Sequence, residues 1–154
     1  MRRAFSVMAL CALPISVVTV GFVGPASAST PATTNIVCKA LAGNIATTGT
    51  LSKCSDKANT GSKGTFSSSS LTTGSGTITW NGTGSTKVTG VTATANGGTA
   101  CPAGDTEYAV TGKTGASKGA AAKSIAKGSK LNALVCLDGS GNFSLVPGTN
   151  FTIT

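Results

Sequence analysis

Apolar and polar residues alternate in short runs along most of the chain. In residues 76–80, Ile78 and Trp80 point to one side and two threonines to the other, which predicts a half-buried strand. Residues 130–137 alternate in the same way. Further strands are predicted at residues 36–41, 45–52, 86–95, 105–112, 143–145 and 151–153, with a short one at Phe66.

Turn-forming residues separate these runs. Asn81 and Gly82 predict a two-residue hairpin turn, because both residue types tolerate positive φ. Gly90 interrupts the alternation of residues 86–95, which predicts a bulge. About eight short strands at this spacing predict an all-β fold. We expect an antiparallel β-sandwich, immunoglobulin-like, or a small barrel.

Residues 115–130, rich in alanine and lysine, depart from this pattern. The alanines could form one or two helical turns, and Gly119 and Gly128 would confine any helix to the residues between them. We expect a crossover loop at one end of the sheet instead.

The first 28 residues have the pattern of a secretory signal peptide. Two arginines precede an apolar run over residues 4–23, and the small residues 26–28 fit a cleavage site. We therefore expect a signal peptide at residues 1–28 and a single secreted domain at residues 29–154. Nothing after the leader approaches the roughly 20 apolar residues of a membrane helix, so no transmembrane segment is predicted in the mature chain.

The expected mature chain is basic and poor in large side chains. It carries ten lysines against four acidic residues and lacks His, Arg and Met. About 126 residues suit one domain, whose core must be built mainly from small aliphatic groups. Its five aromatic residues are Phe66, Trp80, Tyr108, Phe143 and Phe151.

Four cysteines remain in the expected mature chain, and an even number in an exported protein predicts two disulfides. The sequence alone permits three pairings. We favour Cys38 with Cys54 and Cys101 with Cys136, because each pair lies on segments that are expected to be neighbouring strands. No CxxC motif and no histidine occurs in the chain, so no metal site is expected.

The composition argues against an enzyme. Without histidine, neither a Ser-His nor a Cys-His catalytic pair can form, and no cofactor motif is present. Asp105 and Glu107 lie two residues apart on one predicted strand face. A carboxylate pair next to a turn is expected to serve solubility rather than glycoside chemistry.

Two groups of residues are candidates for binding. Lys118, Lys123, Lys127 and Lys130 form the strongest local charge cluster, which predicts either a solvated loop or a contact with an anionic cell-wall polymer. Nucleic acid is an unlikely partner, because the expected mature chain has no arginine and the nearest aromatic residue is Tyr108. Trp80 and Tyr108 are a possible platform for a ligand such as a sugar ring, although a lone Trp beside Ile78 is more often part of a core.

Several segments resemble small secreted, four-cysteine, β-rich proteins of actinobacteria. They are residues 38–54, 76–80 and 101–108 and the tail 135–149. The resemblance implies export and an all-β domain, and it implies no activity.

These features together favour a non-enzymatic, secreted, cationic protein. We expect a binding or structural role at the cell envelope or in the extracellular space, with an anionic wall polymer or a polysaccharide as partner. A carbohydrate- or small-ligand-binding module is the alternative. A secreted inhibitor of a protease or hydrolase, which would present residues 113–130 as an exposed loop, is a third.

Overall fold

The computed structural model describes residues 34–154, except for residue 57 and the segments 68–72 and 82–83. The predicted signal peptide at residues 1–28 and the second residue of the predicted Asn-Gly turn lie outside the described residues.

Nine strands run through the described residues, close to the positions that the alternation predicts. They are β1 (Ile36–Asn44), β2 (Thr48–Cys54), β3 (Lys63–Ser67), β4 (Ser75–Trp80), β5 (Gly84–Ala95), β6 (Thr106–Gly119), β7 (Lys130–Leu137), β8 (Asn142–Leu145) and β9 (Phe151–Ile153). All their pairings are antiparallel.

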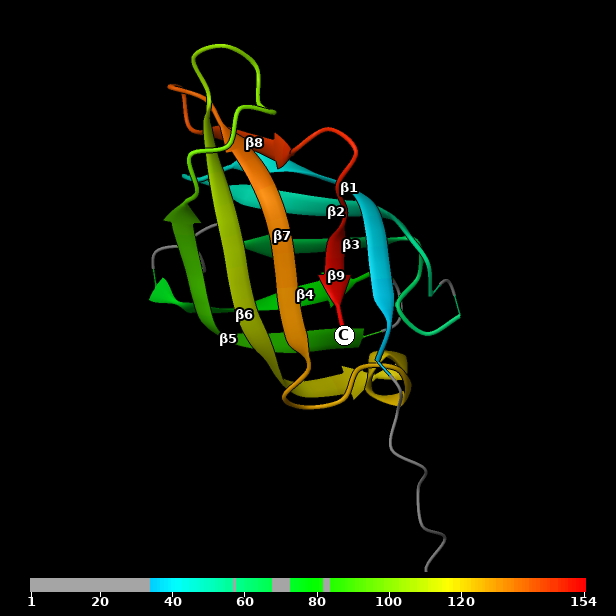
Figure 1. Cartoon of the computed structure of the whole chain (residues 1–154). Helices are drawn as coiled ribbons and strands as arrows, with labels where there is room; N and C mark the ends of the chain where they lie inside the picture. Colours follow the sequence, from blue (N-terminus) through cyan, green and yellow to red (C-terminus); the bar gives the residue numbers. More distant parts are fainter. Residues whose placement is uncertain (1–33, 57, 68–72, 82–83) are drawn as a thin grey trace, which may run out of the picture.

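The strands form one closed sheet (Figure 1). Each of β2 to β7 pairs with the next strand along the chain, and β1 pairs with β2 on one edge. On its other edge β1 pairs first with β9 and then with β8, which also pair with the two ends of β7. The two short strands therefore share one position in the barrel.

This closure gives a barrel of eight strands with one extra strand, so the predicted sandwich is wrong and the small barrel is the correct alternative. The all-β class and the antiparallel pairing are confirmed. Sandwich and barrel share the same period-two pattern, because both bury one face of each strand. They differ only in whether the first and last strands meet.

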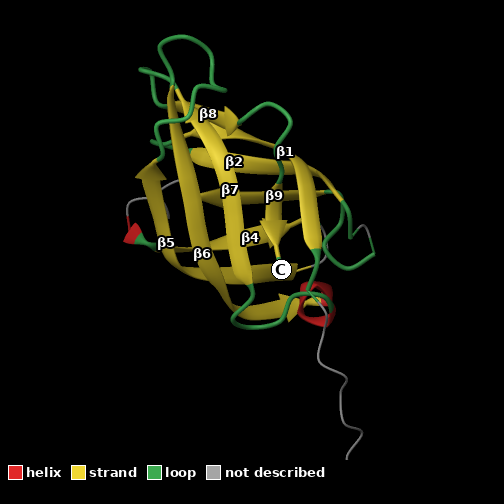
Figure 2. Ribbon diagram, viewed as in Figure 1, coloured by secondary structure: helices red, strands yellow, loops and turns green. Residues whose placement is uncertain are grey.

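A bulge in β5 helps the sheet to bend. The register with β6 shifts between Thr86 and Val88, where β6 has the extra residue, and between Thr89 and Thr92, where β5 has it. Gly90 lies within the second shift and has φ 60°, a conformation that favours glycine. The predicted bulge at this residue is confirmed. Figure 2 shows the result: β5, β6 and β7 cross the strands β2, β3 and β4 at a steep angle.

Residues 115–130 differ from the crossover loop that was expected. Their first part continues β6 to Gly119, and a 3-10 helix, η1 (Ala120–Lys123), follows. The Thr114 hydroxyl donates to the carbonyl oxygen of Ala126 at 2.6 Å, and the Asn59 side-chain amide donates to Ser124 at 2.6 Å. These bonds hold residues 120–129 across one end of the barrel, called here the closed end.

Two disulfides join parts of this barrel. Cys38–Cys54 connects two residues that are opposite each other on β1 and β2. Cys101–Cys136 attaches the loop between β5 and β6 to β7. Both favoured pairings are confirmed.

Removal of the second disulfide should be costly. The Cys101→Ala/Cys136→Ala variant opens a loop with a sequence separation of 35 and should lose about 4 kcal/mol of unfolding free energy on the chain-entropy account. Urea unfolding of oxidised wild type and variant measures the difference. A loss below about 1 kcal/mol would contradict the assignment of a stabilising role to this bridge.

Candidate functional site

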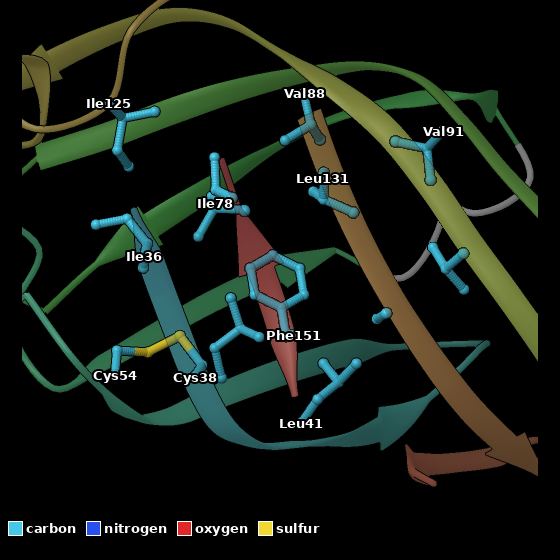
Figure 3. Packing of buried hydrophobic residues seen from close by; sticks show 14 of the residues in the cluster. Ile36, Cys38, Leu41, Cys54, Ile78, Val88, Val91, Ile125, Leu131 and Phe151 are labelled. Carbon is cyan, nitrogen blue, oxygen red and sulfur yellow. A yellow bond between two sulfur atoms is a disulfide. The ribbon is translucent and has the colours of Figure 1, made fainter. Parts of the chain in front are cut away.

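An apolar cavity of about 240 Å³ lies inside the barrel. Of its fifteen lining residues, fourteen have pure hydrocarbon side chains, and the remaining one is Tyr108. They come from the strands on all sides, because the inward positions of every strand point to a common axis. Figure 3 shows Val88, Val91, Leu131 and Phe151 directed toward this interior.

The cavity exists because the inward side chains are small or lie flat. Ala93 and Ala133 line it from β5 and β7. The rings of Phe66 and Phe143 stack with centroids 6.3 Å apart. Each ring occupies the space that a Cβ would take on a facing glycine, Gly49 for Phe66 and Gly43 for Phe143. Both rings therefore lie against the wall and leave the centre of the barrel empty.

Trp80 fills the closed end and does not line the cavity. It is 1% exposed, and its indole N–H donates to the Thr86 hydroxyl at 2.9 Å. That hydroxyl is 3.1 Å from the Ser117 hydroxyl, so the polar atoms of this end satisfy one another. Trp80 is therefore a core residue.

Trp80 and Tyr108, the two members of the predicted ligand platform, are far apart. Trp80 pairs with Gly84 at the start of β5, whereas Tyr108 pairs with Ala95 at its end. Tyr108 is half-buried and lines the cavity. Only the tyrosine of the predicted pair is thus placed to meet a ligand in the cavity.

The opposite end of the barrel is open. Ile45 is 42% exposed and still lines the cavity. Ala93 is exposed, and Tyr108 and Leu137 are half-buried. These four residues, from the β1–β2 turn and from the matching ends of β5, β6 and β7, define the mouth. Sequence reasoning missed Ile45, which was predicted only as the first residue of a strand over residues 45–52.

A network of hydrogen bonds fixes the turn that carries Ile45. The Ile45 N–H donates to the Gly141 carbonyl oxygen at 2.9 Å, and the Asn44 side-chain amide donates to Asn142 Oδ1 at 3.0 Å. The Asn142 side-chain amide donates in turn to Asp138 Oδ2 at 2.9 Å. The β1–β2 and β7–β8 turns thus form one rim of the mouth.

Glu107 is buried outside the barrel wall rather than solvated. It is 6% exposed and accepts a hydrogen bond of 2.8 Å from the Asn96 side-chain amide. Its Oε2 has no hydrogen-bond partner among the described residues. The loop that covers it is the one that Cys101–Cys136 attaches to β7. Glu107 therefore helps to anchor this loop, and it does not line the cavity.

The predicted lysine cluster lies at the closed end. Lys118 is near the end of β6, Lys123 ends η1, Lys127 follows it and Lys130 begins β7. All four are exposed. The structure adds Lys113, which is the direct cross-strand partner of Lys130. Sequence reasoning missed Lys113 because it is 17 residues from Lys130, and the register of β6 and β7 that pairs them was not predicted.

Comparison of the chain with protein-family models, with curated proteins and with solved structures found no match. Within the described part of the chain, no helix is long and apolar enough to cross a membrane. No group of three or more His, Cys, Asp or Glu side chains there is placed to hold a metal ion. The assignment of function therefore depends on the cavity and the surface themselves.

The rim of the mouth should weaken in acid. Hydrogen bonds from the side chain and the backbone N–H of Asn142, and from the N–H groups of Ser140 and Gly141, lower the pKa of Asp138 below its ordinary value of 3.8. Because the pKa of Asp138 is lower in the folded state, the ionised carboxylate stabilises the fold. This stabilisation is present above about pH 4 and is lost as the pH falls through the folded pKa. Asp138→Asn should therefore show a smaller loss of unfolding free energy between pH 5 and pH 2.

Urea unfolding at these two pH values measures this effect, and Asp105→Asn, outside the network, is the control. Equal acid sensitivity in wild type and Asp138→Asn would show that the turn does not depend on the charge.

Proposed function

We propose that the protein binds a small apolar molecule inside the barrel. The observation that carries this proposal is an apolar cavity of about 240 Å³ with a mouth at one end. A closed apolar cavity is normally a defect that lowers stability. An apolar cavity with an exposed, ordered rim is instead typical of a binding site.

The size of the cavity limits the ligand. An apolar cavity of about 150 Å³ stays dry and binds benzene. Scaling by volume, 240 Å³ accommodates on the order of ten non-hydrogen atoms. A longer molecule would extend through the mouth between Ile45 and Tyr108.

The lining also limits the chemistry of the ligand. A buried charge or hydroxyl without a partner is destabilising, and Tyr108 is the only residue in the lining of this cavity whose side chain carries a polar atom. We therefore propose an uncharged, hydrocarbon-like ligand with at most one polar end, placed at Tyr108. A sugar needs many hydrogen-bond partners, so of the two predicted ligand types this cavity favours the small ligand over the carbohydrate.

The inhibitor hypothesis gains less support. It requires residues 113–130 to protrude as an exposed loop. Residues up to Gly119 instead continue β6, and Thr114 and Asn59 hold the remainder against the barrel.

Titration with naphthalene, which has ten carbon atoms, tests the proposal. Methyl resonances of Val88, Val110 and Leu131 should shift in ¹H–¹³C spectra, because these residues line the cavity. Ala133→Leu places three more carbons in the cavity and should weaken binding at least tenfold, without lowering the free energy of unfolding. Ala122→Leu, the same change at an exposed position of η1, is the matched control and should bind as wild type does.

Ala93→Phe provides a second test that leaves the interior unchanged. Ala93 is exposed at the mouth, so a ring there should obstruct access without unfolding the protein. Equal affinity in wild type, Ala133→Leu and Ala93→Phe would overturn the proposal, as would shifts confined to surface residues.

A further inference from the structure

A second binding surface lies at the opposite end of the barrel from the mouth. Six exposed lysines lie on the outer sides of β5, β6 and β7 and on the connection through η1. They are Lys87, Lys113, Lys118, Lys123, Lys127 and Lys130. This set is called the lysine surface.

The arrangement of Lys113 and Lys130 is unfavourable for folding. They are direct partners in the antiparallel register of β6 and β7, and both are exposed. Cβ atoms of such partners are about 5 Å apart, and like charges at this distance destabilise a sheet. Lys87 adds to the same region, because its Cβ lies near Gly115 of β6. A bound anion would turn this repulsion into attraction.

Of the four acidic residues, Asp105, Glu107 and Asp138 lie toward the other end of the barrel, and Asp56 alone lies near the lysine surface. Glu107 and Asp138 lie outside the barrel wall at the same end as the mouth, bonded to Asn96 and Asn142. Along β6, Glu107 is eleven residues from Lys118, roughly 35 Å at the strand rise. Asp56 is nearer, in the loop whose Asn59 contacts Ser124. Its Oδ1 accepts from the Asn59 N–H, and its Oδ2 is buried.

Positive charge is thus concentrated toward the closed end of the barrel, where Asp56 is the acidic side chain that lies near it. A surface with net positive charge concentrates anions and steers them to one end of a protein. Solubility alone would be served as well by scattered lysines. The concentration of lysines at one end therefore supports a contact with an extended anion.

We propose that the lysine surface binds a linear phosphodiester polymer of the cell envelope. Lysine contacts phosphate as a point charge, without the bidentate geometry that arginine uses to read bases. Stacking on bases is not available either, because Trp80 is buried and Tyr108 lies at the mouth. A polymer whose anionic groups are its phosphates fits these side chains. Such binding goes beyond ligand uptake and would leave the mouth directed away from the polymer.

Calorimetric titration with poly(glycerol phosphate) of defined length tests this proposal. Lys113→Gln/Lys130→Gln should weaken binding at least tenfold at 50 mM salt. It should also reduce the slope of log K against log salt by about 1.4, since two phosphate contacts of a single-stranded polymer are lost. Lys39→Gln/Lys53→Gln removes the same charge from exposed positions of β1 and β2, and should weaken binding less than threefold.

Three results would overturn the proposal. An equal loss of affinity for poly(glycerol phosphate) in both double variants would show that only net charge matters. Binding that persists at 0.5 M salt would exclude contacts between exposed charges. Equal or tighter binding of single-stranded DNA with the same number of phosphates would make nucleic acid the partner. Naphthalene binding should be unchanged in both double variants, so the two proposals can fail separately.

Discussion

Closure of the sheet through β1 is the constraint on which the rest of the structure depends. β1 pairs with β2 on one edge and with β9 and β8 on the other, so neither edge of the strand is left open. Open edges leave N–H and C=O groups unpaired and invite association with other chains, and a closed barrel removes them. Closure also directs the inward side chains of all strands to one common interior. A chain with few large residues can then form an ordered fold without filling that interior.

The two ends of the barrel have different properties for physical reasons. At the closed end, Trp80 and the connection through η1 fill the opening, and hydroxyl and amide groups satisfy one another there. At the mouth, the β1–β2 turn and the first residues of β6 leave Ile45 and Tyr108 beside an empty apolar space. The six residues of the lysine surface lie toward the closed end, whereas Lys39, Lys53 and Lys63 are exposed on β1, β2 and β3. The proposed ligand and the proposed polymer therefore use opposite ends, and one can bind without displacing the other.

The strands, the bulge and the disulfides were predictable from the sequence, whereas the closure of the sheet was not. Strand positions follow from alternation, the bulge follows from Gly90, and both disulfides follow from cysteines on segments that are predicted to be neighbouring strands. The pairings of β1 with β8 and β9 join residues about 100 positions apart, and no local pattern encodes them. For the same reason the cavity, the mouth and the Lys113–Lys130 pair were not foreseen. Trp80 and Tyr108 were predicted as one possible platform, and the structure places them at opposite ends of β5.

The central claim is that the closed sheet surrounds an empty apolar space. Crystals of the protein under xenon pressure test it directly, because xenon enters dry apolar cavities and scatters strongly. The account predicts xenon density inside the barrel between Leu131, Phe143 and Phe151, with the wall strands unmoved. A barrel interior filled by side chains, or occupied by ordered water with no xenon, would contradict it.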